Sequence, residues 1–181
     1  ALPEAPFTLG VLLWQTGRAD EALTLFEQAI ARKPDYARAH YMAATVLKQA
    51  GRLQDAIPRL REAIRCDPLS AEAHLSLGQA LRQTGEETEA ARAIAEADRL
   101  NRRTAAAQAS TFAVSVGRRL AAAGDHAGAL AKFREAVRLA PDNPQAQQQL
   151  ALELQRRGEV REARTRFAEA RRLREAAADA A

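Results

Sequence analysis

The chain has 181 residues, of which 47% are hydrophobic and only 4% aromatic, and its formal net charge is +4. Alanine, leucine, glutamate, glutamine and arginine dominate, and all of them favour helix. Cys66 is the one cysteine, which excludes an internal disulfide and a cysteine metal cluster. No stretch approaches the ~18 apolar residues of a membrane span. The composition therefore predicts a helical protein and leaves its compartment open.

Charge is distributed unevenly along the chain. Residues 1–98 carry 11 basic and 14 acidic groups, whereas residues 99–181 carry 16 basic and 9 acidic groups. A basic half is one feature of nucleic-acid binding, but its arginines are interleaved with Glu159, Glu162 and Glu169. We interpret them mainly as a solvated, salt-bridged helix face. Nucleic-acid binding through Arg156–Arg174 is kept as a weaker alternative.

In chain order, the helical patterns form five pairs, which makes ten principal helices in one array over residues 1–181. The pairs occupy approximately residues 3–36, 37–70, 71–104, 110–143 and 144–177. Each pair is divided by a glycine, and the glycines lie 34 residues apart except for one step of 39: Gly17, Gly51, Gly85, Gly124 and Gly158. The longer step inserts five residues near 103–109. Because Arg99–Phe112 contains no glycine or proline, we expect a lengthened helix there.

Other positions repeat in the same register. A leucine stands four residues before each glycine, and an alanine follows each glycine after five residues. A second alanine stands seven residues further on, so both share one helix face and let a neighbouring helix approach. Between the two alanines lies a bulky apolar residue that fills the groove beside them: Phe26, Leu60, Ile94, Phe133 and Phe167.

The turns also carry recognisable signals. The dividing glycine is expected to end the first helix of each pair in the left-handed conformation, which only glycine adopts without penalty. Proline is expected to stop the second helix at Pro34, Pro68 and Pro141. The expected caps of the helices that follow are Asp35, Ser70 and Asn143, with Pro144 in the first helical position.

This combination of a 34-residue period, glycine, paired alanines and terminal proline resembles the tetratricopeptide repeat family over about residues 3–174. Glycines in the first helices (Gly10, Gly78 and Gly117) add to the resemblance. The tryptophan of the family is replaced, in repeat order, by Pro6, His40, His74, Ala113 and Gln147. The resemblance implies an all-α fold, a right-handed α-solenoid of helix–turn–helix repeats, with a concave groove that binds peptides.

Residues suited to catalysis or metal binding are few. His40 and His74 occupy equivalent places in adjacent repeats, and neither has a ligand at zinc-motif spacing in its own helix, so we expect a core role. Cys66 takes a position that is leucine in later repeats and is expected to pack. No phosphate loop, Ser/His/Asp arrangement or pair of carboxylates stands out. We therefore predict a protein that is not an enzyme, with no catalytic residue, cofactor or metal ion.

Binding is expected on the face of each first helix that packing leaves free, because residues at i, i+4 and i+7 share a face. By the resemblance this face lines the groove, apolar and aromatic at its N-terminal end, cationic in its middle and glutamine-rich at its C-terminal end. The predicted partner-binding residues are Phe7, Val11, Tyr41, Thr45, Lys48, Leu75, Gln79, Arg82, Arg118, Gln148 and Gln155.

These predicted partner-binding residues form a stripe along the first helices, and the stripe contains cations and no carboxylate. An acidic or carboxylate-bearing segment would therefore complement Lys48, Arg82 and Arg118, although the alternative is that these are ordinary solvated cations. The Lys/Asn carboxylate clamp of chaperone-binding family members is not matched, since residues such as Tyr41 and Thr45 stand in its place. Binding of a chaperone tail is therefore disfavoured.

The opening helix is apolar nearly all round at Leu9–Trp14, a pattern typical of a buried helix. We expect self-association through this helix or contact with a preceding repeat. The function predicted from the sequence is a protein–protein interaction scaffold, and the alternative is a non-catalytic recognition arm of a larger enzyme or of a secretion or assembly complex. Neither nucleic acid nor membrane is the expected partner.

Overall fold

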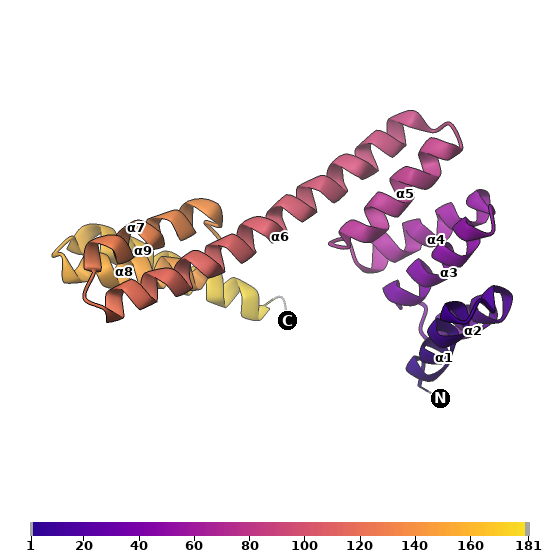
Figure 1. The fold of residues 1–181 in the computed structure, drawn as a ribbon, viewed down its shortest axis with the longest axis horizontal. Helices are drawn as coiled ribbons and strands as arrows, with labels where there is room; N and C mark the ends of the chain where they lie inside the picture. The colour runs from indigo at the N-terminus through magenta and orange to yellow at the C-terminus, as the bar shows by residue number, and fades with distance from the viewer. Residues whose placement is uncertain (1, 180–181) are drawn as a thin grey trace. The chain divides into compact units, whose positions relative to one another are not determined.

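The computed structural model describes residues 2–179 and contains nine α-helices and no strand in this part of the chain (Figure 1). They are α1 (Glu4–Gln15), α2 (Ala19–Arg32), α3 (Ala37–Gln49), α4 (Leu53–Cys66), α5 (Ala71–Gln83), α6 (Glu87–Ala122), α7 (His126–Leu139), α8 (Pro144–Arg156) and α9 (Val160–Asp179). The predicted all-α class is confirmed.

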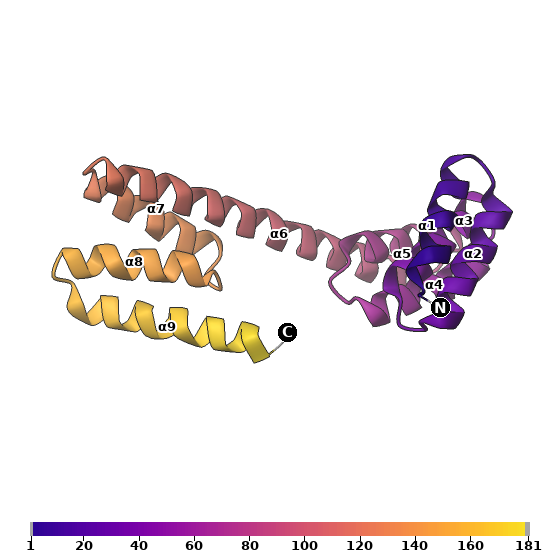
Figure 2. The same ribbon diagram turned by 90° about the horizontal axis from the view of Figure 1, so that it is seen from below.

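The chain divides into two compact units, unit 1 (Ala1–Asn101) and unit 2 (Arg102–Ala181). In unit 1 each of the helices α1 to α4 packs against the next. In unit 2, α7 packs against α8 and α8 against α9, and Figure 2 shows these helices side by side. Each unit is thus built from helices stacked in chain order. The single array with the five repeat boundaries given above stays a prediction.

Helix α6 is one continuous helix of 36 residues. The sequence predicted two helices here, the second of the third pair and the first of the fourth, so the expected count of ten was wrong. Arg102 stands where proline ends other second helices, and nothing between Arg99 and Phe112 breaks the hydrogen-bonded ladder. The expected lengthened helix is confirmed. Despite this length, the described residues include no helix that is both long and apolar enough to cross a membrane.

The turns within the repeats follow one geometry. At the first turn Gly17 has φ 82°, its N–H donates to the Trp14 carbonyl at 3.1 Å, and the Arg18 N–H donates to the Leu13 carbonyl at 2.9 Å. This is the Schellman arrangement, which satisfies carbonyls that a helix end would leave unpaired. Positive φ and the same two hydrogen bonds recur at Gly51, Gly85, Gly124 and Gly158. The left-handed glycine stop is confirmed, and the leucine column supplies an acceptor in each turn.

The caps are only partly as predicted. The Ser70 hydroxyl accepts a hydrogen bond from the Ala73 N–H at 3.2 Å, and Asn143 caps α8, which begins at Pro144. Asp35 is wrong as a cap: α3 follows Tyr36, which has no side-chain capping bond. Tyr36 is the residue 34 positions before Ser70, so Asp35 lies one residue before the cap position.

At three of the five positions that replace the family tryptophan, the side chain joins neighbouring repeats. The Nε2 atom of His40, a residue only 3% exposed, lies 2.9 Å from the carbonyl oxygen of Pro34. His74 makes the equivalent contact with the Pro68 carbonyl at 3.1 Å, and the Gln147 amide donates to the next equivalent proline carbonyl at 2.8 Å. A side-chain N–H thus ties the start of a repeat to the proline that ends the previous one. The core role expected for the two histidines fits His40, which is buried, whereas His74 makes the same contact from a half-buried position.

Within a repeat, the bulky residue of the second helix lies against a small residue of the first. Phe26, Leu60 and Phe133 are at most 1% exposed. A Cβ atom built on Gly117 would lie 2.5 Å from the Phe133 ring, closer than van der Waals contact allows. In the second repeat the corresponding first-helix residue is Ala44, and the bulky residue there is the smaller Leu60. In these two repeats the sizes of the two residues compensate each other, whereas the fifth repeat pairs Ala151 with Phe167, which is only half-buried.

Helix α1 is buried on only one face. Pro6, Phe7 and Gly10 are buried, whereas Leu9 and Leu12 are 49% and 56% exposed. In the described structure the apolar helix therefore presents leucine side chains at its surface.

The packing of Gly117 against Phe133 predicts a compensating pair of substitutions. Gly117→Ala gains up to about 1 kcal/mol of helix propensity but overpacks the site at a cost of about 1–3 kcal/mol. We expect a lower free energy of unfolding in urea. Adding Phe133→Leu, which imitates the Ala44 and Leu60 combination, should make the double variant more stable than the sum of the two single changes predicts. Strict additivity would show that the two residues do not constrain each other.

Candidate binding pocket and interaction face

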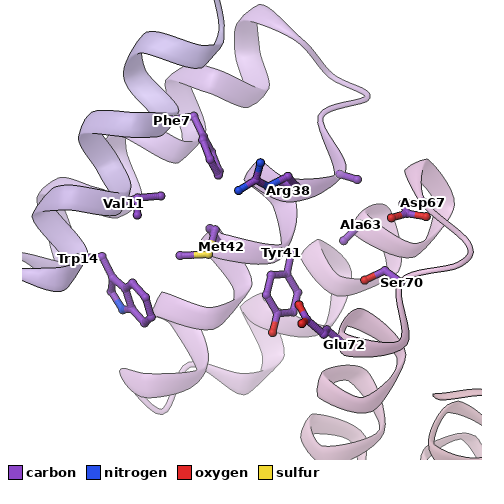
Figure 3. Close-up of a pocket in the computed structure, with 11 residues that line it drawn as sticks. Phe7, Val11, Trp14, Arg38, Tyr41, Met42, Ala63, Asp67, Ser70 and Glu72 are labelled. Carbon is purple, nitrogen blue, oxygen red and sulfur yellow. The ribbon is translucent and has the colours of Figure 1, made fainter. Parts of the chain in front are cut away.

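Unit 1 contains a pocket of about 280 Å³ between its first helices (Figure 3). Helix α1 contributes Phe7, Val11 and Trp14, which lie at i, i+4 and i+7 and so share one face. The rest of the wall comes from α3, from the end of α4 and from the segment around the start of α5. The other lining residues are Ala37, Arg38, Tyr41, Met42, Ala63, Asp67, Ser70 and Glu72.

Phe7 combines a core role with a place in the pocket wall. It is 6% exposed, and its ring centroid lies 5.7 Å from that of Phe26 and 5.0 Å from that of Tyr36. The Arg38 guanidinium lies 5.1 Å from the Phe7 ring centroid, within range of a cation–π interaction. Phe7 therefore holds repeat 1 against repeat 2 as well as bounding the pocket.

Trp14 is fixed at the edge of the pocket. Its indole N–H donates a hydrogen bond of 2.9 Å to the Gln49 side-chain oxygen at the end of α3. Trp14 is half-buried, and Figure 3 shows its indole on the same side of α1 as Val11. Because it is the chain's one tryptophan, its fluorescence reports directly on this pocket.

The pocket carries charges of both signs. Its lining includes the Arg38 guanidinium and the carboxylates of Asp67 and Glu72. Asp67 already accepts a hydrogen bond from the Leu69 N–H at 3.1 Å, and the Ser70 hydroxyl is used in the cap of α5. The sequence-based stripe omitted these polar residues because they come from the α3 start and from the turn between repeats, outside the i, i+4, i+7 pattern.

Lys48 and Gln79, predicted from separate repeats, are brought together. The Lys48 ammonium lies 3.4 Å from the Gln79 side-chain oxygen and 3.5 Å from the Ser76 carbonyl, both on α5. Burial lowers the pKa of Lys48 below its ordinary value, because the charged form loses solvation. Lys48 is therefore a partly desolvated cation between α3 and α5, and the alternative interpretation as an ordinary solvated cation does not describe it.

The other predicted residues of unit 1 differ in what they offer a ligand. The Thr45 hydroxyl donates to the Tyr41 carbonyl at 2.9 Å, so its proton is already engaged. Leu75 is 38% exposed, and Arg82 is exposed. Tyr41, Leu75 and Arg82 are thus available along α3 and α5.

Unit 2 holds the remaining predicted residues. Gln155 on α8 and Arg118 on α6 are exposed, while the Gln148 oxygen accepts a hydrogen bond from Arg174. Three arginines of α9 form ion pairs within their helix, Arg166 with Glu162, Arg171 with Glu175 and Arg172 with Glu169, as the alternating charges predicted. A groove continuous over both units stays a prediction.

The fold and the sequence register define a family. A tetratricopeptide repeat model matches residues 7–57 and, in a second overlapping match, residues 41–105, together more than half of the chain. The chain therefore belongs to the tetratricopeptide repeat family, whose members are protein-interaction scaffolds. No curated protein matches the chain significantly.

Solved structures similar to this chain share its fold. One is the MamA protein, with 22% identity, a TM-score of 0.54, and coverage of 98% of this chain and 94% of that chain. Another is TTC0263, a thermophilic TPR protein of Thermus thermophilus, with 26% identity, a TM-score of 0.50 and 98% coverage of both chains. A third is the second TPR of Spaghetti (RPAP3) bound to an HSP90 peptide, with 18% identity, a TM-score of 0.54, and coverage of 55% of this chain and 93% of that chain.

The burial of Phe7 predicts that it and Val11 respond differently to truncation. Phe7→Ala should lower the free energy of unfolding by about 3–5 kcal/mol, because it leaves a cavity where the ring now contacts Phe26 and Tyr36. Val11→Ala, at a half-buried position of the same wall, should cost less than about 1.5 kcal/mol. Urea denaturation followed by circular dichroism measures both. Equal losses would contradict the assignment of Phe7 to the core.

Proposed function

We propose that this chain binds an extended segment of a partner protein on the first-helix face of unit 1, with an apolar or aromatic side chain of the segment inserted in the pocket. The observation that carries the proposal is the pocket itself, walled by Val11, Trp14 and Tyr41. Aromatic and aliphatic walls with a few polar groups are typical of sites that accept a buried anchor side chain.

The charges along the same face suggest which segment fits. The pocket lining holds one cation, Arg38, and two carboxylates, Asp67 and Glu72, so this part of the site does not favour an acidic anchor side chain. Lys48 and Arg82 lie further along α3 and α5, where the described stripe has no carboxylate. An acidic residue C-terminal or N-terminal to the anchor would complement them. Partial desolvation strengthens such a contact, because solvent screens it less.

The family likeness supports a protein ligand. The second TPR of RPAP3 is described with a bound HSP90 peptide, which is a segment rich in acidic residues, SRMEEVD. At 18% identity this likeness supports the fold only, and the absence of the Lys/Asn clamp from the sequence argues against the same ligand here. The proposal includes no catalysis, since the Ser70 hydroxyl at the pocket is used as a helix cap.

A displayed random-peptide library, selected against the purified chain, tests this function directly. Peptides that bind in the pocket should change the fluorescence of Trp14, the only indole present. Tyr41→Ala should weaken their binding by at least about tenfold, which corresponds to the loss of one anchor contact. Selection of no peptide, or of peptides that leave Trp14 fluorescence unchanged and bind the Tyr41→Ala variant equally well, would contradict the proposal.

Charge reversal tests the role of the cations. Lys48→Glu combined with Arg82→Glu should abolish binding of selected acidic peptides, since truncating a desolvated charged contact alone costs about 2–5 kcal/mol. Lys48→Glu should lower the melting temperature, because it puts a carboxylate beside the Gln79 and Ser76 oxygens at a partly buried position. Arg82→Glu, at an exposed position, should change it little, because surface charges usually alter stability by less than ~0.5 kcal/mol. Arg164→Glu with Arg171→Glu makes the same change of charge on α9 and should leave binding intact. If only this second pair destroyed binding, the partner would lie on another surface.

The exposed leucines of α1 support self-association. Leu9 and Leu12 border a broad, shallow apolar depression together with Val11 and Tyr36. We expect sedimentation velocity to detect a dimer of the wild-type chain, and Leu12→Glu to shift it to monomer without lowering the melting temperature. A wild-type chain that stays monomeric at high concentration would exclude this second role.

A further inference from the structure

Three potential metal ligands meet in the second repeat, and none of them lines the pocket. His40 lies on α3, and Glu62 and Cys66 lie four residues apart on α4. A ring nitrogen of His40, a carboxylate oxygen of Glu62 and the Sγ atom of Cys66 all lie within 4.8 Å of one another. The sequence alone did not group them, because the histidine comes from a different helix than the other two.

The geometry of His40 leaves one nitrogen ready to bind a cation. Its Nε2 lies 2.9 Å from the Pro34 carbonyl, which only accepts hydrogen bonds, so Nε2 carries the proton. The Nδ1 atom then has a free lone pair. It is buried and has no hydrogen-bond partner among the described residues. A buried unpaired acceptor costs stability, and a histidine oriented through its second nitrogen by a carbonyl is the usual arrangement of a metal ligand.

The other two ligands already attract positive charge. Arg65 Nε donates to the Glu62 carboxylate at 2.8 Å, and an Arg65 terminal nitrogen lies 3.6 Å from the Cys66 Sγ. The Arg65 hydrogen bond is the main cause that lowers the pKa of Glu62. Arg65 is exposed and belongs to the surface of α4, so its guanidinium can leave for solvent when a metal ion replaces it.

Comparison with the other repeats shows which features of this cluster belong to the repeat fold and which are particular to the second repeat. In the third repeat the equivalent residues are His74, Glu96 and Leu100, and both the histidine–carbonyl contact and a Glu96–Arg99 pair are present. These two features are therefore part of the repeat framework. The second repeat differs in having cysteine where later repeats have leucine, and it alone combines all three donor residues.

We propose that His40 Nδ1, the Glu62 carboxylate and the Cys66 thiolate bind a divalent ion of the zinc type. Nitrogen, oxygen and sulfur donors together match Zn²⁺ and Co²⁺ and disfavour Mg²⁺ and Ca²⁺. In a tetrahedral site with bond lengths of about 2.0–2.3 Å, the ligand atoms lie about 3.5 Å from one another. Rotation of the Glu62 and Cys66 side chains would bring their ligand atoms from within 4.8 Å to this separation. The fourth position is left for water or a partner's side chain. The ion joins α3 to α4.

The test uses the tag-free full chain after chelator treatment. Titration with Co²⁺ should produce the ultraviolet charge-transfer absorption of a thiolate–cobalt bond with one equivalent bound, and Zn²⁺ should displace the cobalt and raise the melting temperature. Cys66→Leu, which copies Leu100, should abolish the absorption. His40→Gln copies Gln147, which makes the same carbonyl contact, and should weaken binding at least about tenfold while the fold is kept.

Matched variants decide the outcome. His74→Gln and Glu96→Gln change the equivalent residues of the third repeat and should leave Co²⁺ binding unchanged. Arg65→Ala should tighten binding, because it removes the competing cation. The proposal is overturned if the wild-type chain shows no thiolate–cobalt absorption, if Cys66→Leu or folded His40→Gln binds as the wild type does, or if the third-repeat variants lose binding equally.

Discussion

In each of three repeats, a large side chain of the second helix lies where the first helix has no side chain at all. Gly10 faces Phe26, Gly78 faces Ile94 and Gly117 faces Phe133. A Cβ atom on any of these glycines would lie closer to the facing side chain than van der Waals contact allows. This close approach fixes how the two helices of a pair cross. The alanines on either side of Phe26 are fully buried and allow the same approach to the next helix. The glycine turns that join the two helices of a pair, and the stacking of one pair on the next, are consistent with this close approach.

The same constraint determines which surface is left for recognition. One face of α1 and one face of α3 pack their small residues against bulky residues of the second helices. A different face of each helix is left without such packing, so space remains between α1 and α3. In unit 1 this produces a pocket whose walls are supplied by Val11, Trp14 and Tyr41. Trp14 is held by its bond to Gln49, so the wall is ordered before a ligand arrives, which lowers the entropic cost of binding.

Short-range periodicity predicted the fold well, and long-range contacts account for what it missed. Glycine turns, proline stops and the Ser70 cap depend on residues within one turn, so the sequence identified them. The lack of a stop between Arg99 and Phe112 was visible in the sequence, but the repeat register led to a count of two helices where α6 is one. The stripe residues Val11 and Tyr41 line the pocket, but Arg38 came from packing between repeats. The His40, Glu62 and Cys66 cluster likewise needs the crossing of α3 over α4.

Hydrogen–deuterium exchange of the chain, with and without a peptide selected for binding, tests most directly whether recognition occurs on the first-helix face of unit 1. Binding raises the free energy of local opening where the ligand contacts the protein. The account predicts slower amide exchange in α1 and α3, strongest near Val11 and Tyr41, with unit 2 unchanged. Protection confined to α2 and α4, or to unit 2, would contradict it.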